Sequence, residues 1–177
     1  MDKKELRKQI RELKRAMTEE QIVSASQRLG ELFLASEYYK NAKTIYGYLP
    51  YNQEVRTVPM LEQAIKDGKR VAVPKCYGDE MRFIYMDDLT KVENGYANIP
   101  EPIADGPVAE DKTALVLMPG MAFTKKGDRM GYGGGFYDKF LAAEPDHPTL
   151  ALCYAFQMVE SLPTEEYDIP VDCVLWA

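Results

Sequence analysis

The sequence predicts an α/β fold: a single layered domain with a largely parallel sheet flanked by helices, and with further helices placed ahead of the sheet at the N-terminus. From about residue 44 onward, short runs of strand-forming residues alternate with helix-type segments, which is the pattern that parallel strands need for their crossover connections. The chain has 177 residues, 46% of them hydrophobic, which is enough for one core and short for two. We therefore expect one domain covering residues 1–177.

The first part of the chain predicts two helices. Apolar residues between Leu6 and Met17 recur at three- and four-residue spacing, which is the stripe of an amphipathic helix. Thr18-Glu19-Glu20-Gln21 then has the form of a capping box, in which the Thr hydroxyl bonds the backbone N–H three residues on. The second helix is expected to run from there to about Ala35.

Strands and helices alternate in the remainder. Runs rich in apolar and β-branched residues predict strands over residues 44–49, 70–73, 81–86, 114–118, 149–154 and 173–176. Helices are expected over residues 58–66 and 136–143, with a short one near Gln157. Between Val92 and Lys112, Asn94-Gly95, Gly106 and several prolines predict a long irregular connection. Ligands of such sheets bind beyond the carboxyl ends of the strands.

Composition limits the partners and the compartment. A net charge of −6 and a pI near 5.0 argue against a nucleic acid or a membrane surface as the main partner, because binding a broad polyanion needs an excess of Lys and Arg. Three widely spaced cysteines predict free thiols, and the charged N-terminal segment lacks the apolar core of a signal peptide. We expect a cytoplasmic monomer that acts on small molecules.

The stretch from Pro119 to Asp138, PGMAFTKKGDRMGYGGGFYD, is the most informative part of the chain. It joins a predicted strand to a predicted helix through a glycine-rich loop that carries Arg129, an arrangement in which backbone N–H groups, a helix start and a guanidinium can face one anion. It is neither a Walker A loop nor a dinucleotide fingerprint, since no Lys-Ser or Lys-Thr follows and a glycine is missing. It predicts a phosphate site; the alternative is a glycine-rich turn without a ligand.

Two aspartates and one basic face are weaker signals. Asp138 lies in a predicted first helical turn and Asp172 at the start of the last strand, and if they converge they would suit Mg²⁺, which is held by one or two carboxylates plus phosphates and water. Lys3, Lys4 and Arg7 open the first helix, where the simplest interpretation is a solvated charged face.

At this point the residues support a family resemblance. PGMAFTKKGDRMGYGGGFYDKFL resembles the signature block of the 5-formyltetrahydrofolate cyclo-ligase family, also called 5,10-methenyltetrahydrofolate synthetases. The segments KKELR, LPYNQEVRT, NIPEP and YDIPVDCVL follow the family's order and spacing over nearly the whole chain. The resemblance implies an ATP- and Mg²⁺-dependent conversion of 5-formyltetrahydrofolate to 5,10-methenyltetrahydrofolate, with release of ADP and phosphate.

The resemblance also implies roles for particular residues. It implies ATP contacts at Lys3, Lys4, Glu5, Leu6 and Arg7 and at Arg129, Met130, Gly131, Tyr132, Gly133, Gly134, Gly135, Phe136 and Tyr137, with Arg129 and Tyr137 catalytic. It implies folate contacts at Tyr51, Arg56, Tyr132, Gly133, Gly134, Gly135 and Phe136, and Mg²⁺ ligands at Asp138 and Asp172.

Two positions depart from the family pattern. Arg56 stands where the family commonly has an acidic residue that accepts hydrogen bonds from the pterin ring, and a guanidinium only donates; Glu54 could serve instead. Phe136 replaces the first tyrosine of the usual pair. Two alternative functions stay open on the sequence alone: a non-catalytic nucleotide or folate sensor, and a sugar-phosphate isomerase that needs neither ATP nor metal.

Overall fold

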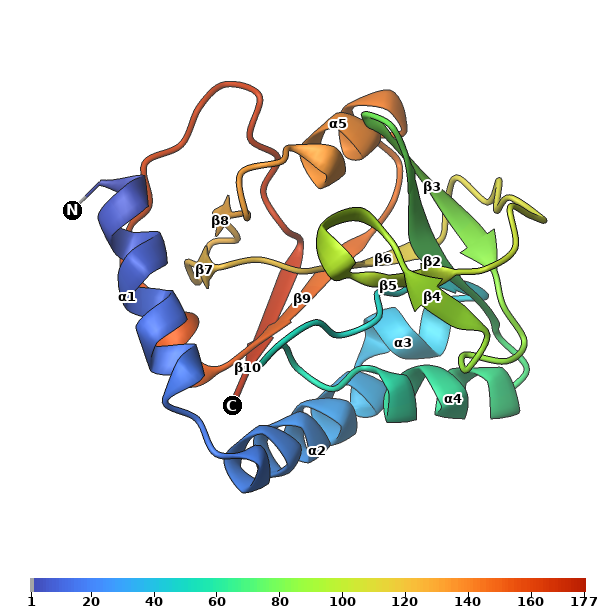
Figure 1. Ribbon diagram of the computed structural model, residues 1–177, viewed down its shortest axis with the longest axis horizontal. Helices are drawn as coiled ribbons and strands as arrows, with labels where there is room; N and C mark the ends of the chain where they lie inside the picture. Colours follow the sequence, from blue (N-terminus) through green and yellow to red (C-terminus); the bar gives the residue numbers. More distant parts are fainter. Residues whose placement is uncertain (1) are drawn as a thin grey trace.

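The computed structural model describes residues 2–177, and its centre is a six-stranded sheet (Figure 1). Every neighbouring pair in it is parallel except β2 with β3. The strand order is β10-β9-β6-β1-β2-β3, with β1 at Thr44–Tyr46, β2 at Arg70–Tyr77, β3 at Glu80–Tyr85, β6 at Leu115–Met118, β9 at Thr149–Cys153 and β10 at Cys173–Trp176. The predicted α/β class with a largely parallel sheet is confirmed.

Helices cover both faces of this sheet. α2 (Glu19–Ala35), α3 (Glu37–Asn41) and α4 (Val58–Lys66) lie on one face and α5 (Phe136–Ala143) on the other (Figure 1). Successive residues of β6 pack on opposite faces: Leu115 and Leu117 belong to the cluster under α2 and α4, while Val116 and Met118 belong to the cluster under α5. A strand buried on both faces needs apolar residues at every position, which explains its unbroken apolar run.

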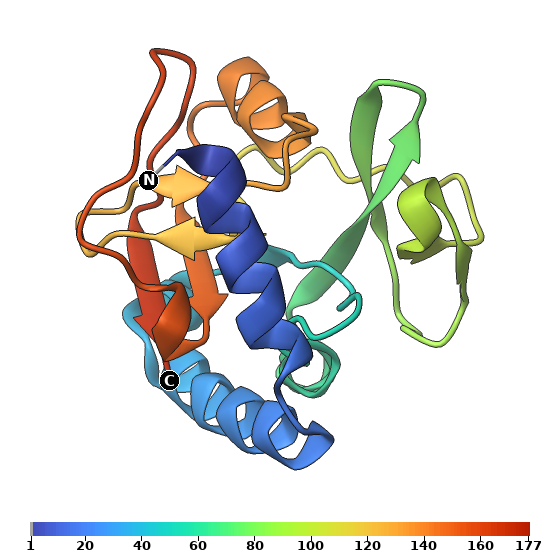
Figure 2. The same cartoon turned by 60° about the vertical axis from the view of Figure 1, so that its left-hand side comes forward.

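The N-terminal helices begin where the sequence indicates. α1 (Lys3–Arg15) is capped by the Asp2 side chain. α2 begins with the predicted capping box, in which the Thr18 hydroxyl accepts from the Gln21 N–H and the Gln21 side chain accepts from the Thr18 N–H. α1 stands at the side of the sheet and passes in front of the strands in Figure 2.

Several short elements were missed. The connection predicted to be irregular holds a two-stranded ribbon, β4 (Val92–Asn94) with β5 (Pro100–Pro102), around the 3₁₀ turn η1 (Tyr96–Asn98). β7 (Ala122–Phe123) and β8 (Arg129–Met130) form a hairpin inside the glycine-rich stretch, and α3 was also missed. Elements of two to five residues carry too little periodicity for sequence prediction.

Two strands differ from the predicted length by three residues or more. β1 ends at Tyr46, three residues early, while β2 continues through Pro74 to Tyr77. The proline is tolerated because β1 pairs with β2 only as far as Ala72, so the β1 side of β2 is open at Pro74. The short helix near Gln157 is present as η2 (Ala155–Gln157). Within residues 2–177, the helices are all too short or too polar to cross a membrane.

Candidate active site

A cavity of about 600 Å³ opens beyond the carboxyl ends of β1, β2 and β6. Tyr48 and Leu49 follow β1, Pro74 and Cys76 lie in the second half of β2, and Pro119 follows β6; all five line the cavity. α1, the glycine-rich stretch, the β4–β5 ribbon and the segment before β10 supply the rest, so segments near both ends of the chain contribute to the cavity. This is the edge of a parallel sheet at which ligands are expected.

The glycine-rich stretch forms one continuous wall of the cavity. All ten residues from Arg129 to Asp138 line it. Gly135 is the N-cap of α5 and has φ of 72°, a left-handed conformation that favours glycine and turns the chain from the loop into the helix. The backbone N–H groups at the start of α5 therefore lie at the cavity, where the helix dipole favours an anion.

Arg129 is the half-buried cation of this wall. Its guanidinium lies 5.8 Å from the centre of the Tyr137 ring, and its Nε has no hydrogen-bond partner among the described residues. Burial lowers the pKa of Arg129 and the negative charge of Asp138 raises it, but a guanidinium stays protonated at physiological pH. A buried donor without a partner suits an anionic ligand, because leaving it unpaired costs free energy.

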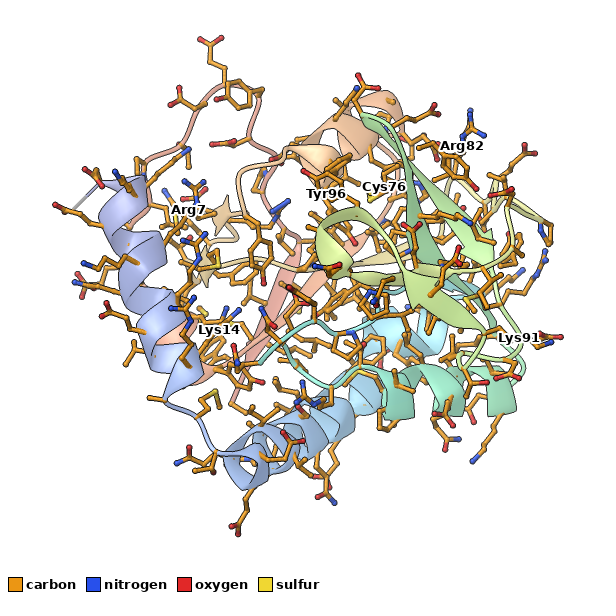
Figure 3. The ribbon with its side chains drawn as sticks, viewed as in Figure 1. Arg7, Lys14, Cys76, Arg82, Lys91 and Tyr96 are labelled. Carbon is orange, nitrogen blue, oxygen red and sulfur yellow. The ribbon has the colours of Figure 1, made fainter. Side chains whose placement is uncertain are left out.

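α1 forms another side of the cavity and contacts the glycine-rich stretch directly. Arg7 Nε donates to the Gly131 carbonyl at 3.2 Å, and Arg7 and Lys14 both project from α1 toward the sheet (Figure 3). The helix is held in place by Ile10, which is buried with Met121 and Met130 of the β7–β8 hairpin.

The N-terminal residues that the resemblance implies for ATP separate into two groups. Lys3 and Arg7 line the cavity, and the Lys3 ammonium lies 3.7 Å from an Asp168 carboxylate oxygen. Leu6 packs into the apolar cluster beneath the helix, while Lys4 and Glu5 are exposed. The helical repeat puts residues three and four apart on one face, so a contiguous run of five cannot all face the ligand.

The segment after β1 places Tyr51 and Glu54 at the cavity. Arg56, on the same segment, does not line the cavity. One Arg56 nitrogen donates to the Asn52 and Glu54 carbonyls, and another pairs with a Glu19 carboxylate oxygen at 3.1 Å. The structure therefore does not bring Arg56 to the predicted folate pocket. Glu54, two residues earlier, faces the cavity as the acidic acceptor considered in its place.

Lys14, Tyr132 and Glu54 form a connected polar group at this end of the cavity. Lys14 Nζ lies 3.3 Å from the Tyr132 hydroxyl, and that hydroxyl donates to Glu54 Oε2 at 3.0 Å. Lys14 was missed because a lysine in a charged helix gives no sequence signal of burial.

The two predicted metal ligands do not share the cavity. Asp138 lines it, and its Oδ1 accepts from the Ile169 N–H at 3.2 Å. Asp172 is exposed, lies outside the described residues that line the cavity, and accepts from the Thr149 N–H at the start of β9. Asp168, four residues earlier, does line the cavity. The sequence prediction named Asp172 of the segment YDIPVD and missed Asp168 as a cavity residue.

Further cavity residues were also missed. Tyr96, Ala97, Ile99, Pro100 and Glu101 come from the β4–β5 ribbon, and Cys76 and Met81 from the β2–β3 pair; Arg11, Arg15 and Tyr167 complete the rim. The motif NIPEP was the available signal for the ribbon.

Among residues 2–177, no group of three or more His, Cys, Asp and Glu side chains is placed to hold a metal.

Comparisons with known proteins agree with this architecture. The model of the "5-formyltetrahydrofolate cyclo-ligase family" matches residues 1–177. A 5-formyltetrahydrofolate cyclo-ligase of Escherichia coli K12 is 31% identical over 173 residues, covering 94% of this chain and 95% of the relative. The mouse (Mus musculus) enzyme of that name is 29% identical over 189 residues, covering 98% and 93%.

Two solved structures are similar over nearly the whole chain. The NMR structure of Aquifex aeolicus 5,10-methenyltetrahydrofolate synthetase superposes with a TM-score of 0.86 at 28% identity, covering 99% of this chain and 90% of that one. A 5,10-methenyltetrahydrofolate synthetase from Mycoplasma pneumoniae gives a TM-score of 0.77 at 25% identity, with 98% of each chain covered.

Proposed function

This chain belongs to the 5-formyltetrahydrofolate cyclo-ligase family and has its enzymatic activity, and we propose that the cavity beyond β1, β2 and β6 is where ATP and 5-formyltetrahydrofolate meet. The reaction converts 5-formyltetrahydrofolate to 5,10-methenyltetrahydrofolate and consumes ATP. A non-catalytic sensor and a sugar-phosphate isomerase are both wrong as interpretations, because the family and the relatives are 5-formyltetrahydrofolate cyclo-ligases.

The chemistry begins by activating a poor leaving group. The formyl oxygen attacks the γ-phosphorus of ATP, and ADP leaves with the electrons of the broken P–O bond. The second folate nitrogen then attacks the formyl carbon and loses its proton, and phosphate departs with the C–O bond electrons. The protein's contribution is to position the reactants and to stabilise the charge on the transferring phosphoryl group.

The main observation that supports this proposal is Arg129. Its half-buried guanidinium, whose buried Nε has no hydrogen-bond partner among the described residues, lies beside the N-terminus of α5 in a wall made wholly of the glycine-rich stretch. We assign Arg129 to the phosphoryl group, with Lys3 and Arg7 as further cations for the phosphates and Tyr137 beside the Arg129 guanidinium. Between Met130 and Gly135 the glycines have no side chains, so the phosphate groups can approach the backbone closely.

We assign the folate to the end of the cavity formed by Tyr51, Glu54, Tyr132 and Phe136. Glu54 offers carboxylate oxygens to the N–H groups of a pterin ring, the role that Arg56 cannot fill. The rings of Tyr132 and Phe136 offer apolar faces next to the glycine backbone, so a flat heterocycle would contact both.

We also propose Asp138 and Asp168 as the residues that hold Mg²⁺. Both line the cavity near Arg129, and two carboxylates plus phosphate oxygens are a donor set that suits this ion. When bound, Mg²⁺ would neutralise charge between the phosphates. Asp172 fits less well because its carboxylate is engaged at the start of β9.

We further propose that residues 1–177 act as one domain and as a monomer, since one chain supplies every wall of the cavity. The three free cysteines suit a reducing compartment, which supports a cytoplasmic location.

The direct test is an assay of the purified protein with 5-formyltetrahydrofolate, ATP and Mg²⁺. We expect the near-ultraviolet absorbance of the methenyl product to appear, with one ADP released for each product formed. Omission of ATP or of the folate should abolish both signals. No absorbance change at ample enzyme, with the folate shown to be intact, would overturn the assignment.

A further inference from the structure

Lys14 is a buried cation to which the proposed function gives no role. It lies in the last turn of α1, lines the cavity, and is only 7% exposed, although lysine side chains are rarely buried unless they are paired. Figure 3 shows it on the side of α1 that faces the sheet, as Arg7 is. A buried ammonium in a substrate cavity calls for a partner.

The partner is reached through a tyrosine hydroxyl. Lys14 Nζ donates to Tyr132 Oη at 3.3 Å, and Tyr132 Oη donates to Glu54 Oε2 at 3.0 Å. The other carboxylate oxygen, Glu54 Oε1, accepts from the Tyr51 N–H at 2.8 Å. The hydroxyl can serve both neighbours because it has one proton to donate and lone pairs to accept. Three segments far apart in the sequence are thereby held in one geometry.

The charges around Glu54 make Lys14 its main compensating cation. Burial raises the pKa of the Glu54 carboxyl, and the charge of Lys14 lowers it more than that of Arg56 does. Arg56 is already paired with Glu19 and touches Glu54 only at its backbone carbonyl. The titratable groups that face Glu54 are Lys14 from α1, Tyr132 and Tyr137 from the glycine-rich stretch and α5, Tyr48 after β1, Tyr154 after β9, and Arg56 on its own segment.

Resting on the proposed function, we propose that Lys14 is a positioning residue for the folate substrate. Through the Tyr132 hydroxyl it keeps the Glu54 carboxylate ionised and oriented, so that both oxygens accept hydrogen bonds from N–H groups of the pterin ring. A protonated Glu54 would offer a donor where an acceptor is needed. Lys14 therefore acts on folate recognition and does not touch the phosphate chemistry at Arg129.

The test uses three variants of the full-length enzyme. Lys14→Met removes the charge and keeps the aliphatic stem, Lys14→Arg restores a cation, and Lys8→Met changes an exposed lysine of the same helix as a control. For each we would measure kcat/KM for 5-formyltetrahydrofolate against pH, and KM for ATP. The acid limb of kcat/KM reports groups of the free enzyme and the free substrate, and the substrate is common to all variants.

We expect Lys14→Met to raise KM for the folate about tenfold and to move the acid limb upward by about one pH unit, because Glu54 loses its compensating charge. KM for ATP should stay within about twofold, since a residue that acts only at the folate end leaves binding at the phosphate end unchanged. Lys14→Arg should restore most of the folate affinity, and Lys8→Met should match the wild type. An unchanged acid limb in Lys14→Met would overturn the proposal, as would an equal rise in KM for ATP.

A second variant tests the proposal if Lys14→Met does not fold. Tyr132→Phe removes only the bridging hydroxyl and should shift the acid limb in the same direction; an unshifted limb contradicts the role of the bridge. If the wild type forms no methenyl product, the proposed function fails by itself, and calorimetric binding of 5-formyltetrahydrofolate to wild type and Lys14→Met across pH then decides the role of Lys14.

Discussion

Gly127 lies against Val171, which is 44 positions further along the chain. The Val171 N–H donates to the Gly127 carbonyl at 2.7 Å, and a Cβ built on Gly127 would lie 2.1 Å from the Val171 carbonyl oxygen. Gly127 also has φ of +101°, which L side chains rarely adopt. This contact fastens the β7–β8 hairpin, which carries Arg129, to the segment that carries Asp168.

We therefore predict that Gly127→Ala destabilises the protein severely. Steric overlap with the Val171 carbonyl and the strained φ should together lower the free energy of unfolding by about 3 kcal/mol or more, measured by urea denaturation. Gly78→Ala is the matched control: its φ is +67° but nothing lies within 4 Å of the added Cβ, so about 1 kcal/mol is expected. Equal losses in the two variants would show that the contact with Val171 is unimportant.

Arg129→Lys should lower kcat by about a hundredfold or more, because a lysine cannot present the planar fork of donors to a phosphoryl group. Steady-state kinetics with both substrates saturating would measure it. Arg82→Lys on β3, where Arg82 is exposed and paired with Glu80, should keep the wild-type rate. A fully active Arg129→Lys enzyme would remove Arg129 from the reaction.

The two aspartates before β10 should behave differently. Asp168→Asn should raise the Mg²⁺ concentration needed for half-maximal activity by about tenfold, since one of two carboxylates is lost. Asp172→Asn should leave that concentration unchanged and cost about 1 kcal/mol of stability, because the amide accepts more weakly from the Thr149 N–H. Magnesium titrations of both variants would decide, and the reverse result would restore Asp172 as the ligand.

Cys76 provides a test of where substrates bind that does not depend on activity. It lines the cavity, whereas Cys173 lies on β10 outside it; burial raises the pKa of both thiols. At alkaline pH, where the thiolate fraction grows, 5-formyltetrahydrofolate should slow alkylation of Cys76 and leave Cys173 unaffected. Peptide mass spectrometry of time points would measure both rates. Equal rates at Cys76 with and without ligand would place the folate elsewhere.

The long elements could be predicted from the sequence because their signals are local. The stripe between Leu6 and Met17, the capping box at Thr18 and the apolar run of β6 each require only neighbouring residues, and the helix, the capping box and the strand all form. The stripe itself is incomplete, because Leu13 is 48% exposed and Met17 lies beyond the end of α1. The β4–β5 ribbon could not be predicted in this way, because its strands of three residues exist only by pairing with each other.

The candidate site, too, could be predicted only in part from the sequence. The glycine-rich stretch could be located from its own residues, and every residue from Arg129 to Asp138 lines the cavity. Within α1, the sequence could not say which of five consecutive residues face the ligand. That depends on where Ile10 packs against Met121 and Met130, which fixes the rotation of the helix.

The sequence by itself determined the α/β class, the order of the longer helices and strands along the chain, and the glycine-rich stretch between β6 and α5, because hydrophobic periodicity and glycine content are properties of contiguous residues. The tertiary structure alone decided that Glu54 rather than Arg56, and Asp168 rather than Asp172, faces the cavity, and that Lys14 is buried there. Each of these choices depends on the direction of one side chain on an irregular segment or a helix face. That direction is set by partners that are tens of residues away in the chain.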